Sequence, residues 1–226
     1  MIWFFLIVIL IMVMSYLNWQ QKIKRMDIIK RFVFDASIQR RVAEAYPHLT
    51  PSQVQQVLEG LRDYFYCVLM VGGKGMLSMP SQAVDEAWHA FILSTKSYEN
   101  FCQRAFGKFL HHHPAETMQT RTQATKGIKR TWNLACRHEQ INPALPARLP
   151  RLFALDALLM IPSGFVYSLN CMAANNPSDS SYCASDIGGG CGGSSSGCSG
   201  GDSSSGDSGG SDGGSGCGGG CGGGGD

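Results

Sequence analysis

Lysine and arginine are absent from both ends of this 226-residue chain, because all 19 of them lie between Lys22 and Arg151. The chain up to Arg151 also holds 10 Asp and Glu, which gives this part a charge of +9. The remainder holds seven acidic residues and no basic one. A basic body is therefore followed by an acidic tail, and this unevenness excludes a uniform globular chain.

Glycine and cysteine are scarce before Cys171, since the last 56 residues hold 21 of the 28 glycines and six of the nine cysteines. Three cysteines are too few for a small secreted domain that disulfides hold together. Residues 172–226 are mostly Gly, Ser, Asp and Cys, with almost no apolar side chains. Such a segment buries too little surface to offset its ordering entropy, so we expect a disordered low-complexity tail.

An apolar stretch from Ile2 to Leu17 contains no charged residue. As a helix it reaches about 25 Å, the short end of what spans a bilayer. Trp3 and Trp19 flank it, where amphipathic rings favour the headgroup layer. No Lys or Arg precedes it and no small-x-small cleavage site follows, which disfavours a cleaved signal peptide. We therefore expect residues 1–21 to be a single-pass transmembrane anchor that contacts the bilayer through residues 2–19.

The orientation of the anchor is predicted from the charges beside it. Lys22, Lys24 and Arg25 follow the apolar stretch closely. The positive-inside rule then places the N-terminus outside and the body in the cytoplasm, at the inner (cytoplasmic) membrane. In the cytoplasm free thiols are the default state of cysteines.

The body, residues 22–171, shows helical periodicity and predicts a small helical bundle, so the expected fold class is mainly α. One helix is expected over residues 27–46. Thr50-Pro51-Ser52-Gln53 is a helix start with a capping box, and Gly72-Gly73 ends that helix. The other expected elements are helices over residues 81–93, 95–107, 118–138 and 152–161 and a strand-like piece over residues 164–171.

A polar site is expected around Asp85 and His89, which share one helix face because they are four residues apart. A helix hairpin through Ser94-Thr95 would bring the histidine run, residues 111–113, back towards them. Carboxylate and imidazole both bind zinc or iron, and three such ligands leave a position open for water. The simpler alternative is an ordinary hydrogen-bonded Asp/His pair, with Cys102 as a small buried hydrophobe.

The segment Val84-Asp85-Glu86-Ala87-Trp88-His89, together with the later Tyr, Cys, Gly and His positions, resembles the plant glycine-rich domain-containing proteins and their bacterial relatives. The resemblance covers about residues 30–171, and its motifs are specific only in combination. It implies an all-helical core and no particular reaction. By this resemblance the site residues are Asp85, His89 and, counted from Gly107, His112, with Trp88, Tyr98 and Cys102 in support.

Three functions stay open at this point. A binding or scaffold protein with a protein partner is favoured, because no complete catalytic set is present. The alternatives are a zinc-type hydrolase with Glu86 or Cys102 as acid/base or nucleophile, and a metal-handling protein whose tail thiols collect soft ions. The tail thiols are Cys183, Cys191, Cys198, Cys217 and Cys221. No nucleic-acid partner is expected, because the positive charge is spread along helices without an interleaved aromatic motif.

Overall fold

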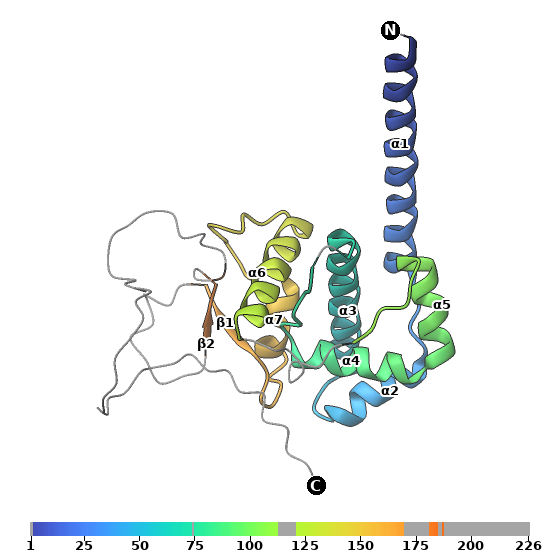
Figure 1. The fold of residues 1–226 in the computed structure, drawn as a ribbon. Coiled ribbons are helices and arrows are strands. Elements are labelled where there is room, and N and C mark those ends of the chain that lie inside the picture. Colours follow the sequence, from blue (N-terminus) through green and yellow to red (C-terminus); the bar gives the residue numbers. More distant parts are fainter. Residues whose placement is uncertain (1, 74, 113–120, 170–180, 185–186, 188–226) are drawn as a thin grey trace, which may run out of the picture.

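The computed structural model describes residues 2–73, 75–112, 121–169, 181–184 and 187 of the chain (Figure 1). This part is mainly helical, as predicted, and it also contains a short two-stranded sheet. The helices are α1 (Ile2–Arg31), α2 (Ala36–Ala45), α3 (Pro51–Val71), α4 (Gln82–Leu93), α5 (Thr95–Phe106), α6 (Arg121–His138) and α7 (Arg151–Leu158), and the strands are β1 (Val166–Ser168) and β2 (Ser181–Cys183).

The first helix is longer than the expected anchor, because the apolar stretch and the first basic residues form one unbroken rod, α1. The single helix expected over residues 27–46 is wrong. The chain leaves helical geometry at Phe32–Asp35, and α2 begins only at Ala36. Phe32 and Phe34 account for the break, since their rings lie 5.2 Å apart at the core and Phe34 is buried.

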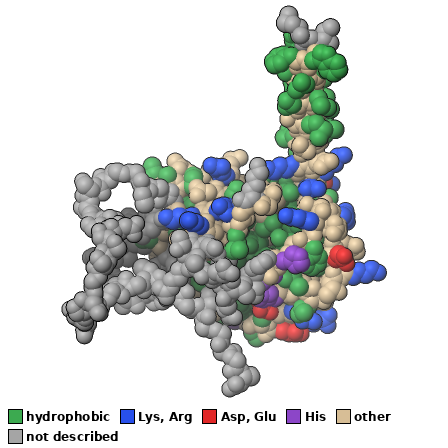
Figure 2. All heavy atoms as spheres, viewed as in Figure 1, with side chains coloured by type: hydrophobic (Ala, Val, Ile, Leu, Met, Phe, Trp, Pro, Cys, Tyr) green, Lys and Arg blue, Asp and Glu red, His purple; other side chains and the backbone are tan. Residues whose placement is uncertain are grey.

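The N-terminal part of α1 stands out from the body as an exposed apolar rod (Figures 1 and 2). None of its most apolar 18-residue window is buried. Trp3 and Trp19, at its two ends, are 79% and 59% exposed. The helix is therefore long and apolar enough to cross a membrane, a property that a signal sequence near the N-terminus shares.

The last turns of α1 belong to the body. Ile29 is buried, and Met26, Ile28 and Phe32 pack against the same core. These turns contact α3 and α5. The apolar rod is thus joined to the body by a continuous helix rather than by a flexible linker.

The two ends of α3 follow their sequence signals. Thr50 and Gln53 form the predicted capping box, in which the Thr50 N–H donates to Gln53 Oε1 at 2.8 Å. At the other end Gly72 has a φ of 60°, a left-handed conformation that glycine adopts without steric cost. Both predicted boundaries of this helix are confirmed.

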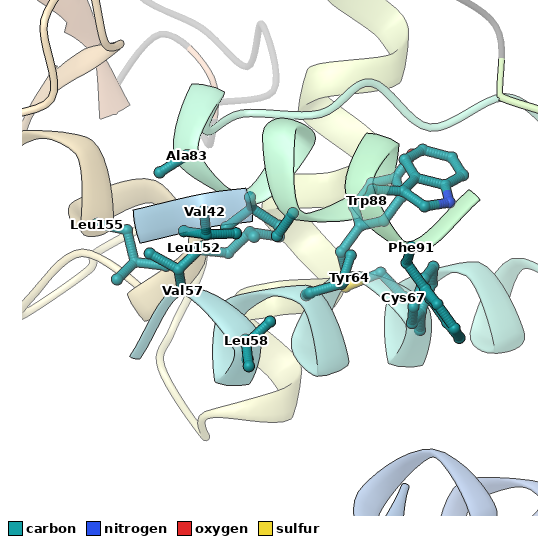
Figure 3. Packing of buried hydrophobic residues seen from close by; sticks show 14 of the residues in the cluster. Val42, Val57, Leu58, Tyr64, Cys67, Ala83, Trp88, Phe91, Leu152 and Leu155 are labelled. Atoms are coloured by element: carbon teal, nitrogen blue, oxygen red, sulfur yellow. The ribbon is translucent and has the colours of Figure 1, made fainter. Parts of the chain in front are cut away.

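The part of the core drawn in Figure 3 lies between α2, α3, α4 and α7. Gly60, in the middle of α3, permits the close approach of α4 and α7 to this helix. A Cβ on Gly60 would lie 2.4 Å from Leu155 Cδ1 of α7 and 2.8 Å from Val84 Cγ2 of α4. The missing side chain therefore lets three helices meet. The labelled core side chains of Figure 3 include Val42, Val57, Leu58, Ala83, Phe91, Leu152 and Leu155.

A two-stranded parallel sheet follows the helices, with Tyr167 of β1 opposite Tyr182 of β2. The first strand lies within the strand-like piece expected over residues 164–171. The second strand lies inside the segment expected to be disordered, so that expectation is wrong for residues 181–183. Apart from residues 181–184 and 187, the expected tail lies outside the described residues.

Candidate metal centre

Helix α4 carries the first two candidate ligands. Ser81 caps the helix as predicted, because the Val84 N–H donates to Ser81 Oγ at 3.2 Å. Asp85 lies in the first turn, where the positive end of the helix dipole favours a carboxylate. His89 follows one turn later, with its Nε2 3.8 Å from Asp85 Oδ2.

The third candidate, His112, comes from the segment after α5. This helix begins directly after Ser94 and ends at Gly107, which has a φ of 74°. The irregular segment from Phe109 to His112 then returns to α4, where His112 Nε2 lies 2.9 Å from Asp85 Oδ1. The hairpin predicted through Ser94 thus places His112 at the site.

The structure brings Asp85, His89 and His112 together. Their ligand atoms all lie within 4.8 Å of one another. Ligand atoms of a tetrahedral zinc ion lie about 3.3 Å apart, so small side-chain rotations would close this group around an ion. The side chain of His112 is 12% exposed and that of His89 is 46% exposed. One side of the group is therefore accessible from solvent.

Among the described residues no Lys or Arg pairs with Asp85, whose carboxylate lies beside His89 and His112. The charge also acts on a buried neighbour. Burial, and then the Asp85 carboxylate, raise the pKa of Tyr64, whose ring lies 5.2 Å from that of Trp88. The site therefore has a local negative potential, which favours a bound cation.

Trp88 and Tyr98 hold the segment that carries His112. The Trp88 indole N–H donates to Tyr98 Oη at 3.1 Å, and that hydroxyl donates to the Leu110 carbonyl at 2.5 Å. The Trp88 ring also meets the His112 ring edge-on, at 4.4 Å between centroids. Trp88 and Tyr98 are both buried, so they position the site without being ligands themselves.

Cys102 is a buried free thiol. Burial raises its pKa, and hydrogen bonds from the Leu110 backbone and the Tyr98 side chain lower it only in part. A nucleophile or a metal ligand must be a thiolate, so this environment argues against both roles. The hypothesis that Cys102 is a nucleophile is therefore dropped, and its contribution is packing beside Tyr98.

Glu86, the other residue considered for acid/base chemistry, is not part of the three-residue group. Its carboxylate acts instead on Tyr46, at the end of α2. Burial, followed by the charges of Glu86, Asp156 and Asp85, raises the pKa of Tyr46 to about 12. Among the described residues, the three-residue group thus has no further acidic or histidine member that would serve as a general base.

Asp156 is a residue that the sequence reasoning missed. It is buried on α7, and its carboxylate accepts hydrogen bonds from Ser81 Oγ at 2.6 Å and from the Gln82 N–H at 2.7 Å. It accepts further bonds from the N–H groups of Ala83 and Phe165. The carboxylate therefore fixes the start of the helix that carries the site. The sequence signal for a buried structural role was that Asp156 is the only acidic residue in the apolar stretch over residues 152–161.

The tail thiols do not join the site within the described part of the chain. Cys183 is half-buried and disulfide-bonded, which departs from the free thiol that is the default state in the cytoplasm. The other predicted tail thiols, Cys191, Cys198, Cys217 and Cys221, lie outside the described residues. Three cysteines of the body are free, namely Cys67, Cys102 and Cys136.

Comparison with known proteins assigns the family. A family model described as UCP032817-like matches residues 24–187, which is most of the chain, so the protein belongs to this uncharacterised family. The resemblance to glycine-rich domain-containing proteins was wrong. It rested on residues that are weak signals singly, and the glycine-rich residues 188–226 lie outside the match. No curated protein and no solved structure matches the chain.

Proposed function

We propose that this protein is a single-pass membrane protein whose helical domain binds a divalent transition metal, with zinc as the favoured ion. The observation that carries the proposal is the group of Asp85, His89 and His112, whose ligand atoms lie within 4.8 Å of one another. The three side chains come from α4 and from the segment after α5, so the fold assembles the group. The protein partner expected from the sequence would then bind this metal-binding body.

The chemistry of the group suits zinc. Two imidazoles and one carboxylate are ligands that zinc accepts in open sites, where water takes the fourth position. The exposed side of His89 is where that water would lie. Hydrolysis by such a water is the alternative function, and it has no assigned base among the described residues, because Glu86 lies outside the three-residue group and Cys102 is a buried thiol.

Metal binding is tested with the full-length chain in detergent, loaded with Zn²⁺ and desalted before elemental analysis. We expect about one zinc per chain from this site, lost in His89→Ala and in His112→Ala. The matched control is His111→Ala, because His111 neighbours His112 in the chain but is not part of the group. An equal zinc content in all four proteins would refute the site.

The cysteines require a second measurement, because thiols of the tail also bind soft metals. Cobalt(II) serves as the spectroscopic substitute for zinc. Thiolate ligands give cobalt an intense charge-transfer band, whereas imidazole and carboxylate ligands do not. We expect the tetrahedral spectrum of cobalt without the charge-transfer band. In His112→Ala this tetrahedral spectrum should be lost. A spectrum made up only of thiolate charge transfer would place the metal on the cysteines instead.

The anchor is proposed from the apolar part of α1, which the body leaves exposed. An exposed apolar surface of this extent marks a membrane or partner contact. We expect the chain to stay in the membrane pellet after alkaline extraction and to keep its full mass of 24.5 kDa. Release into the supernatant, or a shortened N-terminus, would favour a cleaved signal sequence.

Two observations bear on the orientation in opposite senses. The basic residues from Lys22 onward favour a cytoplasmic body, whereas the disulfide at Cys183 favours an oxidising compartment. We propose the cytoplasmic orientation, at the inner membrane, because the charges lie directly beside the apolar stretch. A C-terminal fluorescent protein that matures only in the cytoplasm should then be bright, and a C-terminal alkaline phosphatase inactive. The reverse pattern would place the body outside.

A further inference from the structure

The end of the body from which the apolar rod emerges carries many cationic side chains. Figure 2 shows several Lys and Arg side chains at this end on the visible face. Asp27 of α1 is close by in the chain and pairs with Arg31 at 2.7 Å. The cationic face is defined here by five residues from two helices, α1 and α6, and from the loop after α5. These residues are Lys22, Lys24, Arg25, Lys108 and Arg130.

Contacts at glycine loops show that these cations lie close to the ends of α3 and α5. Arg25 Nη2 lies 2.6 Å from the position that a Cβ would take on Gly107, the residue that ends α5. Lys108 Nζ lies 3.0 Å from the corresponding position on Gly73, just after α3. The base of α1 and the ends of two other helices therefore form one surface.

Arg130 of α6 extends this surface. Its Nη1 donates to the Met76 carbonyl at 2.8 Å, in the loop that follows α3. Within the described part of the chain, no carboxylate forms an ion pair with any residue of the cationic face. Lys24, Lys108 and Arg130 are exposed. The charge of this face is thus available to an external anion.

Along α1 the face begins at the outer limit of the lipid headgroups and continues just beyond it, within a Debye length of the surface. At 1.5 Å per residue, Lys22 lies about 8 Å and Arg25 about 12 Å beyond Leu17, the last residue of the apolar stretch. The headgroup layer occupies roughly 5 to 8 Å on each side of the hydrocarbon. Since α1 continues without a break into the core, the body cannot turn this face away from the bilayer.

We propose that the cationic face docks on anionic phospholipid headgroups, so that the body lies against the membrane surface. This proposal rests on the proposed anchoring and is independent of metal binding. Anionic lipid attracts juxtamembrane Lys and Arg within a Debye length of the surface. The body then has one fixed orientation, with α2 at the end that faces away from the membrane (Figure 1).

The test uses the full chain in lipid nanodiscs, either purely zwitterionic or with about one third of anionic phosphatidylserine. Co-elution of the chain with both discs reports on anchoring alone. The rate of amide hydrogen exchange at residues 107–110 then measures contact between the cationic face and the lipid surface. We expect exchange there to slow by at least about fivefold in the anionic discs, and the slowing to vanish in high salt. Residues 36–45 of α2 should exchange equally in both discs.

A matched pair of charge reversals completes the test. Lys24→Glu with Lys108→Glu should abolish the lipid-dependent slowing. The control, Arg40→Glu with Arg41→Glu, reverses two charges on exposed positions of α2. This control should leave the lipid-dependent slowing of exchange unchanged. Circular dichroism confirms that both variants are folded.

Three results would overturn the docking proposal. Equal exchange of residues 107–110 in both discs would do so while leaving the anchor intact. Slowing confined to α2 would assign the membrane contact to the opposite end of the body. Failure to co-elute with either disc would remove the anchor and the docking together.

Discussion

His112 Nε2 lies 2.9 Å from Asp85 Oδ1, although 27 positions separate the two residues in the chain. The contact exists because α4 and α5 form a hairpin and because Tyr98 holds the Leu110 carbonyl two residues before His112. The candidate site is therefore a property of the tertiary structure. Its geometry and the stability of the hairpin should change together.

The Asp85–His112 pair should behave as one unit in metal-free buffer. In a double-mutant cycle with Asp85→Ala and His112→Ala, we expect a coupling free energy of about 0.5–2 kcal/mol in urea unfolding. The reason is that each single change already removes the shared hydrogen bond. Replacing His112→Ala by His111→Ala gives the control cycle, which should be additive to within about 0.5 kcal/mol. Additivity in both cycles would show that the pair does not interact in solution.

Tyr98→Phe removes a hydroxyl that accepts from Trp88 and donates to Leu110. Both partners are left unsatisfied, so we expect a loss of about 2 kcal/mol in the free energy of unfolding. Zinc affinity should fall roughly 10-fold, because His112 loses its support. The control is Tyr66→Phe on α3, for which the described residues show no hydroxyl hydrogen bond and which should leave zinc affinity unchanged. Unaltered zinc affinity in Tyr98→Phe would show that the hydrogen bonds of Tyr98 do not position His112 for metal binding.

The boundaries of α3, α4 and α5 could be predicted because each has a local signal. Thr50 and Ser81 are caps, and Gly72 and Gly107 adopt the left-handed conformation that ends a helix. The pairing of Asp85 with His89 followed from helical spacing alone. The choice of His112 within the histidine run did not, since it depends on the path after Gly107 and came from a resemblance that named the wrong family.

The continuation of α1 to Arg31 and its break at Phe32 had no local signal. Both depend on aromatic packing, since the Phe32 ring lies 4.7 Å from that of Phe101 on α5. Asp156 was missed for the same reason, because its partners at the start of α4 are more than 70 positions away in the chain. Local patterns therefore predicted the helices, and contacts between distant residues decided how they meet.

Asp156→Ala should be the most destabilising polar change in the body. It leaves a buried hydroxyl and three buried or half-buried N–H groups without their acceptor. We expect a loss of about 3 kcal/mol or more in urea unfolding, and a smaller loss in Asp156→Asn, which keeps one acceptor oxygen. The control is Asp27→Ala, which breaks an exposed ion pair with Arg31 and should cost less than about 1 kcal/mol. Similar losses in both alanine variants would contradict the capping role.

Alkaline pH should destabilise the body through its buried thiols. Burial, and then the Asp63 carboxylate, raise the pKa of Cys67 from 9.0 to about 12. Between these values the unfolded chain releases a proton that the folded chain retains. The contribution of Cys67 to stability is thus fully present below pH 9 and declines as the pH rises towards 12. One such thiol gives a slope of about −1.4 kcal/mol per pH unit.

Urea unfolding under reducing conditions, at several pH values from about 8 to 10.5, measures this slope. Cys67→Ala should be less stable at pH 8, because it leaves a cavity, but its stability should fall less steeply above pH 9. Val68→Ala, at the next position of the same helix, should lower stability without changing the slope. Parallel curves for Cys67→Ala and the parent chain would mean that this thiol ionises in the folded state as it does in the unfolded one. Burial of Cys67 would then be incomplete in solution, and the packing of α3 against its neighbours would have to be looser than the structure shows.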